Sequence, residues 1–105
     1  MLIGERHLEV IYKSRQIEAY CTIAAKAERK YGIRMAGKIQ QRIAEIRAAD
    51  TVEMMIACHI GRCHPLKGNR KEQYAVDLVH PYRLVFTKNG KEIQIAEIQE
   101  IVDYH

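Results

Sequence analysis

The sequence predicts an α+β fold in which an antiparallel β-sheet is covered on one face by an N-terminal helical hairpin, in the order β-α-α-short α-β-β-β. Three observations support this prediction. Apolar residues recur every three or four positions between residues 14 and 49, and they alternate with other residues from residue 74 onward. A stretch rich in glycine, proline and cations separates these two halves. We expect one domain over residues 1–105, because this length suits a single core.

The first half reads as a short strand followed by two helices. Leu8 to Tyr12 is rich in β-branched and aromatic residues, which favours a strand. Ser14 is a suitable N-cap for a helix that runs to Tyr31. Gly32 stands where a glycine commonly ends a helix, and a second helix is expected from about Ile33 to Ala49. The apolar stripe of this second helix comprises Ala36, Ile39, Ile43 and Ile46.

A short helical segment and three strands follow. Asp50-Thr51-Val52-Glu53 resembles a capping box that opens a short helix through Ile56. Further on, Asn89-Gly90 is a strong hairpin signal. The last segment alternates like a strand, although Ala96 to Ile101 could also bend or turn helical. The expected strands of this half are Tyr74–Val79, Tyr82–Thr87 and Glu92–Val102.

The net charge of +4 is unevenly distributed along the chain. Nine basic residues stand against three acidic ones between Lys13 and Arg47, and seven against two between Arg62 and Lys91. The last fourteen residues contain four acids and no Lys or Arg. A basic body of this kind favours a polyanionic partner such as nucleic acid. Many soluble domains are mildly basic without binding one, so charge alone leaves the question open.

Composition also indicates the compartment. Three cysteines are too few for a secreted disulfide framework and favour a reducing cytoplasm. No apolar run approaches the roughly 18 residues of a membrane helix, and the N-terminal residues lack a signal-peptide pattern, so we expect no membrane partner. Cys58-His59 and Cys63-His64 do not match the usual spacings of structural zinc, so we expect no metal site.

The stretch from Gly61 to Arg70 is the first candidate site. Its two glycines let the backbone approach a ligand closely, and its cations suit an anion. His64 can move a proton at neutral pH, beside the cation Lys67. The hypothesis is a phosphate-binding loop, and the alternative is a solvated basic turn. The cations of this region that would hold a nucleic-acid backbone are Arg62, Arg70 and Lys71.

Two further groups could complete such a site. Arg83 lies within an apolar strand, so its guanidinium must face solvent or a partner, and it could stabilise a phosphorane. The chain ends in Asp103-Tyr104-His105. Chain ends are usually frayed, but the preceding strand could carry these three residues back across the sheet. There Asp103 could orient a histidine and Tyr104 could stack on a base.

Together these residues resemble a known family. His64-Pro65-Leu66-Lys67-Gly68, the strand Tyr82-Arg83-Leu84-Val85-Phe86 and the terminal Asp103-Tyr104-His105 are similar to the HigB branch of the RelE/ParE toxin superfamily. These are toxins of type II toxin–antitoxin modules, also called plasmid maintenance killer proteins. The resemblance covers nearly the whole chain from Leu8, which leaves residues 1–7 as a short N-terminal extension.

The resemblance implies a ribosome-dependent endonuclease that cleaves mRNA without a metal or other cofactor. The ribose 2′-hydroxyl would attack the adjacent phosphate, and a helix-turn-helix antitoxin would neutralise the toxin. By position, His64 and His105 would be base and acid in either order, and Lys67 and Arg83 would stabilise the transition state. Asp103 would orient a histidine, and Tyr104 would stack on or position a nucleobase of the RNA. The expected partners are the antitoxin, the ribosome and mRNA, with DNA reached only through the antitoxin.

Two alternatives remain open at this point. Relatives of the ParE type share the fold and lack RNase chemistry, so the chain could be a catalytically silent protein that binds an antitoxin, gyrase or nucleic acid. It could also be a small basic α+β domain with an unrelated role. Two imidazoles and an aspartate close to a phosphate-binding loop favour the enzyme, because a pure binding surface does not need them.

Overall fold

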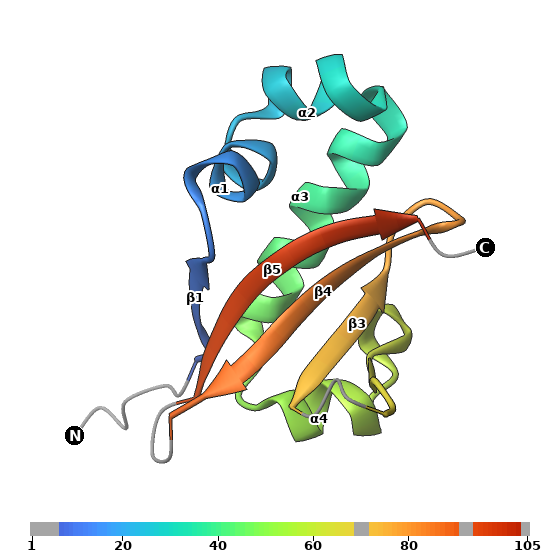
Figure 1. Cartoon of the computed structure of the whole chain (residues 1–105). Helices are drawn as coiled ribbons and strands as arrows, with labels where there is room; N and C mark the ends of the chain where they lie inside the picture. Colours follow the sequence, from blue (N-terminus) through green and yellow to red (C-terminus); the bar gives the residue numbers. More distant parts are fainter. Residues whose placement is uncertain (1–6, 69–71, 91–93, 104–105) are drawn as a thin grey trace.

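The computed structural model describes residues 7–68, 72–90 and 94–103 of the chain. Within these residues it contains four α-helices, one short 3-10 helix and a five-stranded sheet (Figure 1), which confirms the predicted α+β class. None of the described helices is long and apolar enough to span a bilayer. The elements are β1 (Glu9–Tyr12), α1 (Arg15–Thr22), α2 (Ala24–Tyr31), α3 (Ile33–Ala48), α4 (Val52–Ala57), η1 (Ile60–Arg62), β2 (His64–Pro65), β3 (Gln73–Asp77), β4 (Tyr82–Asn89) and β5 (Ile95–Asp103).

The sheet has the strand order β1-β5-β4-β3-β2. Strands β2 to β5 pair with their neighbours in antiparallel fashion, as predicted, whereas β1 lies parallel to β5 at the edge of the sheet. Helices α1 to α3 all lie between β1 and the other strands in sequence. A connection of that length can bring two strands side by side in parallel, which a short turn cannot do.

The first predicted helix is in fact two helices. Ser14 caps α1 as expected, and its hydroxyl accepts a hydrogen bond from the backbone N–H of Ile17. The break falls at Ile23, whose backbone is extended (φ −116°, ψ 99°). The preceding Thr22 donates its hydroxyl to the carbonyl of Glu18. Two consecutive β-branched residues are weak helix formers, and this local preference explains the break.

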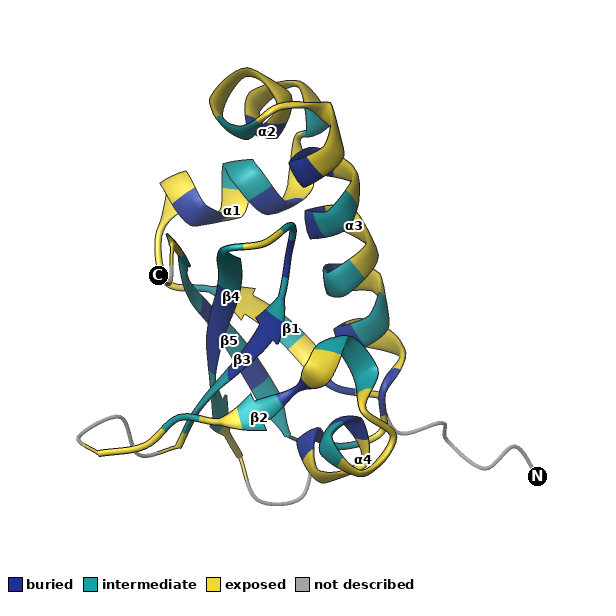
Figure 2. Cartoon of the chain, turned by 90° about the vertical axis from the view of Figure 1, so that its right-hand side faces the viewer, coloured by how far each residue is buried: buried dark blue, intermediate teal, exposed yellow. Residues whose placement is uncertain are grey.

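Helix α3 supplies the apolar stripe that covers one face of the sheet. It begins after Gly32, whose φ of +93° favours glycine. Its buried residues include the four predicted from the periodicity, and they belong to the same core cluster as the inward residues of β4 and β5. Figure 2 shows the buried positions of α3 turned toward the strands. The principal members of this core are Ile39, Ile43, Ile46, Leu84, Phe86 and Ile98.

The predicted capping box, which begins at Asp50, is not formed, because the N-cap is one residue later. Thr51 caps α4 by accepting a hydrogen bond from the backbone N–H of Met54. Glu53 turns to the sheet instead, where its carboxylate accepts hydrogen bonds from Lys88 at 2.5 Å and from the side chain of Gln94 at 2.9 Å. Lys88 belongs to β4, and Gln94 immediately precedes β5. Glu53 therefore connects α4 to the end of the β4–β5 hairpin.

The stretch expected to be a loop contains two short elements. His64–Pro65 forms β2, which pairs with β3 so that His64 lies opposite Ala75. The pairing continues one residue further, since the backbone N–H of Leu66 donates to the carbonyl of Gln73. Alternation cannot reveal a strand of two residues, which explains why the sequence suggested only a loop.

The third predicted strand also differs in detail. The predicted hairpin is present, but β4 and β5 are joined by residues 90–94 rather than by a two-residue turn. The possible bend at Ala96 to Ile101 is a β-bulge, because Val85 pairs with Glu100 and Phe86 with Ile98. The extra residue is Gln99, whose amide group donates to Thr87 and Glu97.

We predict that Glu53 contributes to stability against acid. Its hydrogen bonds from Gln94 and from Lys88 lower its pKa from 4.5 to about 2. A lowered pKa in the folded state adds stability above the ordinary pKa, and this stability is lost as pH falls from about 4.5 toward 2. The side chain is 57% exposed, so we expect Glu53→Gln to cost less than about 1 kcal/mol at neutral pH.

Thermal melts at neutral pH and at about pH 2 would check this prediction. The difference between the wild type and Glu53→Gln should shrink as the pH is lowered. Glu9→Gln is a matched control, because Glu9 is also an exposed carboxylate but belongs to a different element, β1. An equal difference at both pH values would contradict the assignment.

Candidate functional site

Helix α3 runs along one face of the sheet (Figure 1). The predicted site residues that β2 and β4 carry, His64 and Arg83, belong to the other face, because they alternate with core residues such as Leu84. Residues that pair across strands share a face. His64 therefore shares a face with its partner Ala75, and Ala75 with Val85. The pair Asp77 and Arg83 lies two positions further along the same strands and so on the same face. We call the side that carries these five residues the open face.

The open face is hollowed next to β2. A shallow depression of about 330 Å³ is lined by His59, Arg62, Cys63, His64 and Arg83. His64 and Arg83 come from strands that are separated by β3 in the sheet, and Arg62 comes from the short helix η1. The fold thus brings His64 and Arg62 close to the guanidinium of Arg83, which lies about twenty residues later in the sequence.

The ring of His64 is oriented by the backbone. Its Nδ1 lies 2.9 Å from the carbonyl oxygen of Arg62. A carbonyl oxygen can only accept a hydrogen bond, so Nδ1 carries the proton. In the neutral ring the lone pair is then on Nε2, the nitrogen on the other side of the ring. A histidine held in this way is suited to accept a proton through Nε2.

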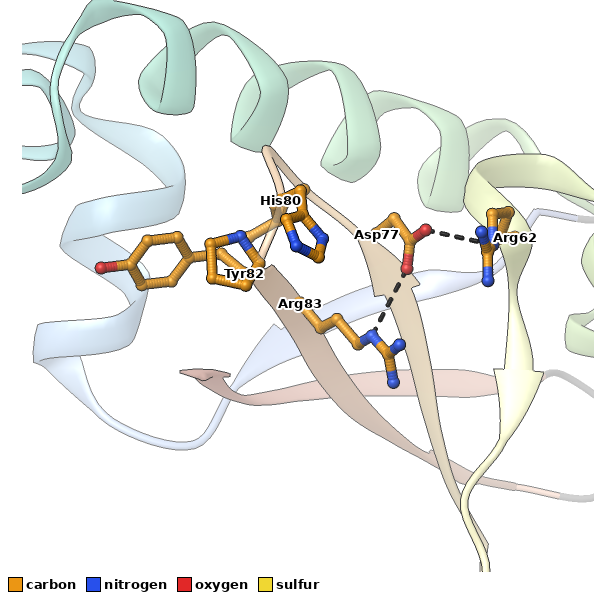
Figure 3. A pocket seen from close by; sticks show the side chains of 7 residues that line it. Arg62, Asp77, His80, Tyr82 and Arg83 are labelled. Carbon is orange, nitrogen blue, oxygen red and sulfur yellow. Dashed lines mark ion pairs between the residues drawn. The ribbon is translucent and has the colours of Figure 1, made fainter. Parts of the chain in front are cut away.

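Arg83 is held by an acidic neighbour on the adjacent strand. Its Nε lies 3.5 Å from one oxygen of Asp77, and the Nε of Arg62 lies 3.2 Å from the other oxygen. Figure 3 shows the carboxylate of Asp77 between the two guanidinium groups. Arg83 is 31% exposed and Arg62 77% exposed, so the first is anchored in the sheet and the second projects into solvent.

The position of Arg62 depends on an unusual backbone and on α3. His59, Gly61 and Arg62 all have φ between +54° and +57°. A Cβ atom on Gly61 would lie 2.9 Å from Nε of Arg42, so a larger residue would displace that side chain. Arg42 in turn donates through Nε to the backbone carbonyl of Asp77 at 2.7 Å. The tight turn of η1 therefore packs on an arginine that also fastens α3 to the end of β3.

A second hollow lies on the other side of the same two arginines. It has a volume of about 170 Å³ and is lined by Asp77, by the turn between β3 and β4, and by both arginines. Figure 3 shows His80 and Tyr82 at its margin. Arg62 and Arg83 line both hollows, so they form the boundary between them.

The structure places the remaining predicted residues apart from this cluster or does not describe them. Lys67 is exposed and follows β2, and it is not among the described residues that line either hollow. Asp103 ends β5 opposite Tyr82, whose ring packs edge-to-face on Tyr31 of α2. By register, the pair of Tyr82 and Asp103 therefore belongs to the helix-covered face. Arg70, Lys71, Tyr104 and His105 lie outside the described residues.

Asp77 and Cys63 lie at the site but were not among the residues predicted to act there. Asp77 contacts both arginines, and its position could have been recognised by the argument that selected Arg83, since it is a charged residue within an apolar alternation. Cys63 lines the first hollow but is buried, which raises the pKa of its thiol to about 11. The thiol is thus protonated at neutral pH and is a poor nucleophile.

We predict that the neutral form of His64 carries its proton on Nδ1, because only a donor can face the Arg62 carbonyl. Long-range ¹H–¹⁵N NMR spectra at alkaline pH distinguish the two tautomers of each histidine. His59, an exposed histidine five residues earlier, serves as the internal comparison. A proton on Nε2 of His64 would contradict the orientation described above.

Comparison with known proteins identifies the fold. No family model matches the sequence, and no curated protein matches it significantly. Several solved structures are similar. Among them, a YoeB/ParE toxin from Agrobacterium tumefaciens has a TM-score of 0.64 at 16% identity, over 93% of this chain and 100% of that one. The YoeB dimer from Staphylococcus aureus has a TM-score of 0.61 at 23% identity, over 94% and 98%. A heterotetrameric YoeB–YefM toxin–antitoxin complex from Staphylococcus aureus has 0.60 at 25%, over 93% and 97%.

All three structures match this chain over nearly its whole length. Each match covers at least 93% of this chain, so the likeness extends from the first strand to the last and includes the helical layer. The chain therefore has the fold of the YoeB/ParE toxins.

Proposed function

We propose that the protein is the toxin of a type II toxin–antitoxin module and cleaves mRNA on the ribosome. The observation that carries the proposal is the meeting of His64 and Arg83 in one hollow on the open face. The fold shared with YoeB/ParE toxins supports it. Within that superfamily, the His64-Pro65-Leu66-Lys67-Gly68 motif and the terminal Asp103-Tyr104-His105 favour the HigB branch.

The proposed reaction is an in-line displacement at phosphorus. The ribose 2′-oxygen loses its proton to a base and forms a bond to the adjacent phosphorus, and the bond from phosphorus to the 5′-oxygen breaks as that oxygen takes up a proton. Nε2 of His64 is available for one of these two proton transfers, since Nδ1 is committed to the Arg62 carbonyl. His105 is proposed for the other transfer, and the order of the two is left open.

The cations have a separate role in this proposal. Negative charge grows on the phosphoryl oxygens in the transition state, and a guanidinium already in place stabilises it without reorganisation. Arg83 suits this task because it projects from a strand with a neighbour on either side, β3 and β5. Lys67 would add charge from the β2–β3 connection, and Arg62, Arg70 and Lys71 would hold the RNA backbone. Asp103 would orient a histidine, and Tyr104 would position a nucleobase of the RNA.

Dependence on the ribosome is consistent with the charge of the open face. Asp77 and, by its pairing with Val85, Glu100 lie on this face among the cations. Acidic groups weaken the binding of free RNA, because they reduce the charge available to neutralise phosphates. We propose that the ribosome supplies the missing affinity by presenting the mRNA, and that the reaction needs no metal ion or other cofactor.

We further propose that a helix-turn-helix antitoxin binds and neutralises the protein in the cytoplasm, and that DNA is contacted only through that antitoxin. The support is that one similar structure is described as a heterotetrameric toxin–antitoxin complex of YoeB and YefM. No membrane partner is proposed.

One observation favours the alternative of a catalytically silent binding protein with this fold. The carboxylate of Asp77 contacts both Arg62 and Arg83 and offsets part of their charge. An active site for phosphoryl transfer is expected to leave such cations for the substrate. Under this alternative the chain would still bind an antitoxin, gyrase or nucleic acid, and it would not cut RNA.

We predict that His64→Ala and Arg83→Ala relieve growth arrest when the protein is expressed without its antitoxin. Loss of a general base or acid slows such reactions by about 10²- to 10⁴-fold, and loss of the guanidinium removes transition-state stabilisation. The measurements are colony counts after induction and the length of a reporter mRNA in translating extracts. His7→Ala is the control, because His7 precedes β1 at the edge of the sheet opposite β2.

If His64→Ala and Arg83→Ala remain fully toxic while mRNA stays intact, the silent binding protein is the correct alternative. If His64→Ala and Arg83→Ala remain toxic and still cut mRNA, the assigned residues are wrong.

We predict that removing bound metal ions from the purified protein does not change its cleavage of mRNA on ribosomes. The chemistry proposed uses proton transfer and arginine charge only. Ribosomes need Mg²⁺, so the protein is first treated with EDTA and desalted, then added to ribosomes in Mg²⁺ buffer alone. Unchanged cleavage is the expected result. Loss of activity that Zn²⁺ or Mn²⁺ restores would contradict the metal-free reaction.

A further inference from the structure

The carboxylate of Asp77 occupies a position that an anion from outside would be expected to take. Its two oxygens lie 3.2 Å from Nε of Arg62 and 3.5 Å from Nε of Arg83. The two arginines come from different elements, η1 and β4, and they share this carboxylate and the two hollows that both of them line. A phosphate group is bound by arginines in the same manner, through charge and N–H donors.

Stability gives little reason for this arrangement. One oxygen of Asp77, Oδ1, is buried, and its ion pair with Arg83 at 3.5 Å is too long for a good hydrogen bond, so it has no hydrogen-bond partner among the described residues. A buried carboxylate oxygen without a hydrogen bond is unfavourable. The pair with Arg62 is largely exposed, and exposed ion pairs contribute little. Replacing Asp77 by Asn, which has the same shape, should therefore leave the fold intact.

We propose that Asp77 is a built-in competitor for phosphate at Arg62 and Arg83, so that only a substrate with further contacts can take its place. The proposal rests on the proposed function for the identity of that substrate, a phosphodiester of RNA. It assigns Asp77 a role in specificity, because its negative charge lowers the attraction of the two arginines for isolated phosphate groups and loosely held RNA.

The geometry also indicates which arginine moves. Arg62 is 77% exposed and belongs to a three-residue helix, whereas Arg83 is 31% exposed on a strand paired on both sides. Turning Arg62 away from Asp77 costs little, since it breaks one exposed ion pair. Arg62 can thus follow an incoming phosphate while Asp77 keeps its contact with Arg83.

The test uses inorganic phosphate as the probe and the complete protein. Nε–H signals of arginines are followed by ¹⁵N NMR while phosphate replaces chloride at constant ionic strength. With Asp77→Asn, the phosphate concentration at half-saturation of the Arg62 and Arg83 signals should fall roughly tenfold, because a unit negative charge a few ångströms away is removed.

Glu97→Gln is the matched control. It removes the same charge from β5. Glu97 pairs with Thr87, and Thr87 lies four residues from Arg83 along β4. We expect its phosphate affinity to stay within about twofold of the wild type, since charges at that separation are largely screened. Equal or weaker phosphate binding by Asp77→Asn, or the same gain with Glu97→Gln, would overturn the proposal.

A second experiment, with RNA as the ligand, tests this inference independently of the proposed cleavage activity. A short 2′-O-methyl RNA cannot undergo attack by a 2′-hydroxyl, so its binding can be measured by fluorescence anisotropy without cleavage. Asp77→Asn should bind it more tightly, and the salt dependence of log Kd should steepen by about 0.7, as for one additional phosphate contact on a single strand. An unchanged salt dependence would contradict the proposal.

The two ideas fail in different ways. If the wild type never cleaves mRNA but Asp77→Asn gains phosphate affinity, the proposed function is wrong and the role of Asp77 as a competitor for phosphate is supported. If the wild type cleaves mRNA and Asp77→Asn has unchanged phosphate affinity, the role of Asp77 as a competitor is wrong and the nuclease function is supported. Thermal melts confirm that each variant is folded, and Asp77→Ser provides the same measurement if Asp77→Asn does not fold.

Discussion

The structure depends on the packing of α3 against β4 and β5. The apolar stripe of α3 and the inward residues of these two strands form one buried cluster that includes Ile39, Ile46, Phe86 and Ile98. Because this cluster uses one face of the sheet, polar side chains of β2 to β4 that need a ligand or a partner must lie on the other. The alternation of β3 and β4 then places Asp77 and Arg83 side by side without any special loop.

The sequence was sufficient to predict the elements that depend on local periodicity and capping. The Ser14 cap, the α3 stripe and the alternation of β3 and β4 are all visible as residue patterns, and the structure confirms them. The strand β2 and the break at Ile23 were missed, because each depends on only one or two residues. The parallel edge strand β1 depends on where a long helical connection returns the chain, which periodicity does not specify.

The candidate site was predictable only in part, for a related physical reason. His64 and Arg83 are conspicuous as residue types in their surroundings, so chemistry alone could select them. Their proximity follows from the register of β2 on β3 and of β3 on β4, which brings them to one hollow. Asp77 was not singled out, although it is a charged residue within an apolar alternation, as Arg83 is. Its two contacts with arginines depend on the register of β3 on β4 and on the position of η1. Whether Lys67, Asp103 and the last two residues take part remains a prediction.

The two halves of the site are held with very different strength. Arg83 belongs to β4, which is paired along its length with β3 and β5. His64 belongs to a short edge strand, with two paired residues and one further backbone hydrogen bond from Leu66. It is preceded by a turn with three left-handed backbone conformations. Protein segments with few pairings open locally far more often than the core unfolds. His64 should therefore detach and return many times during the lifetime of one folded molecule, whereas Arg83 stays in place throughout.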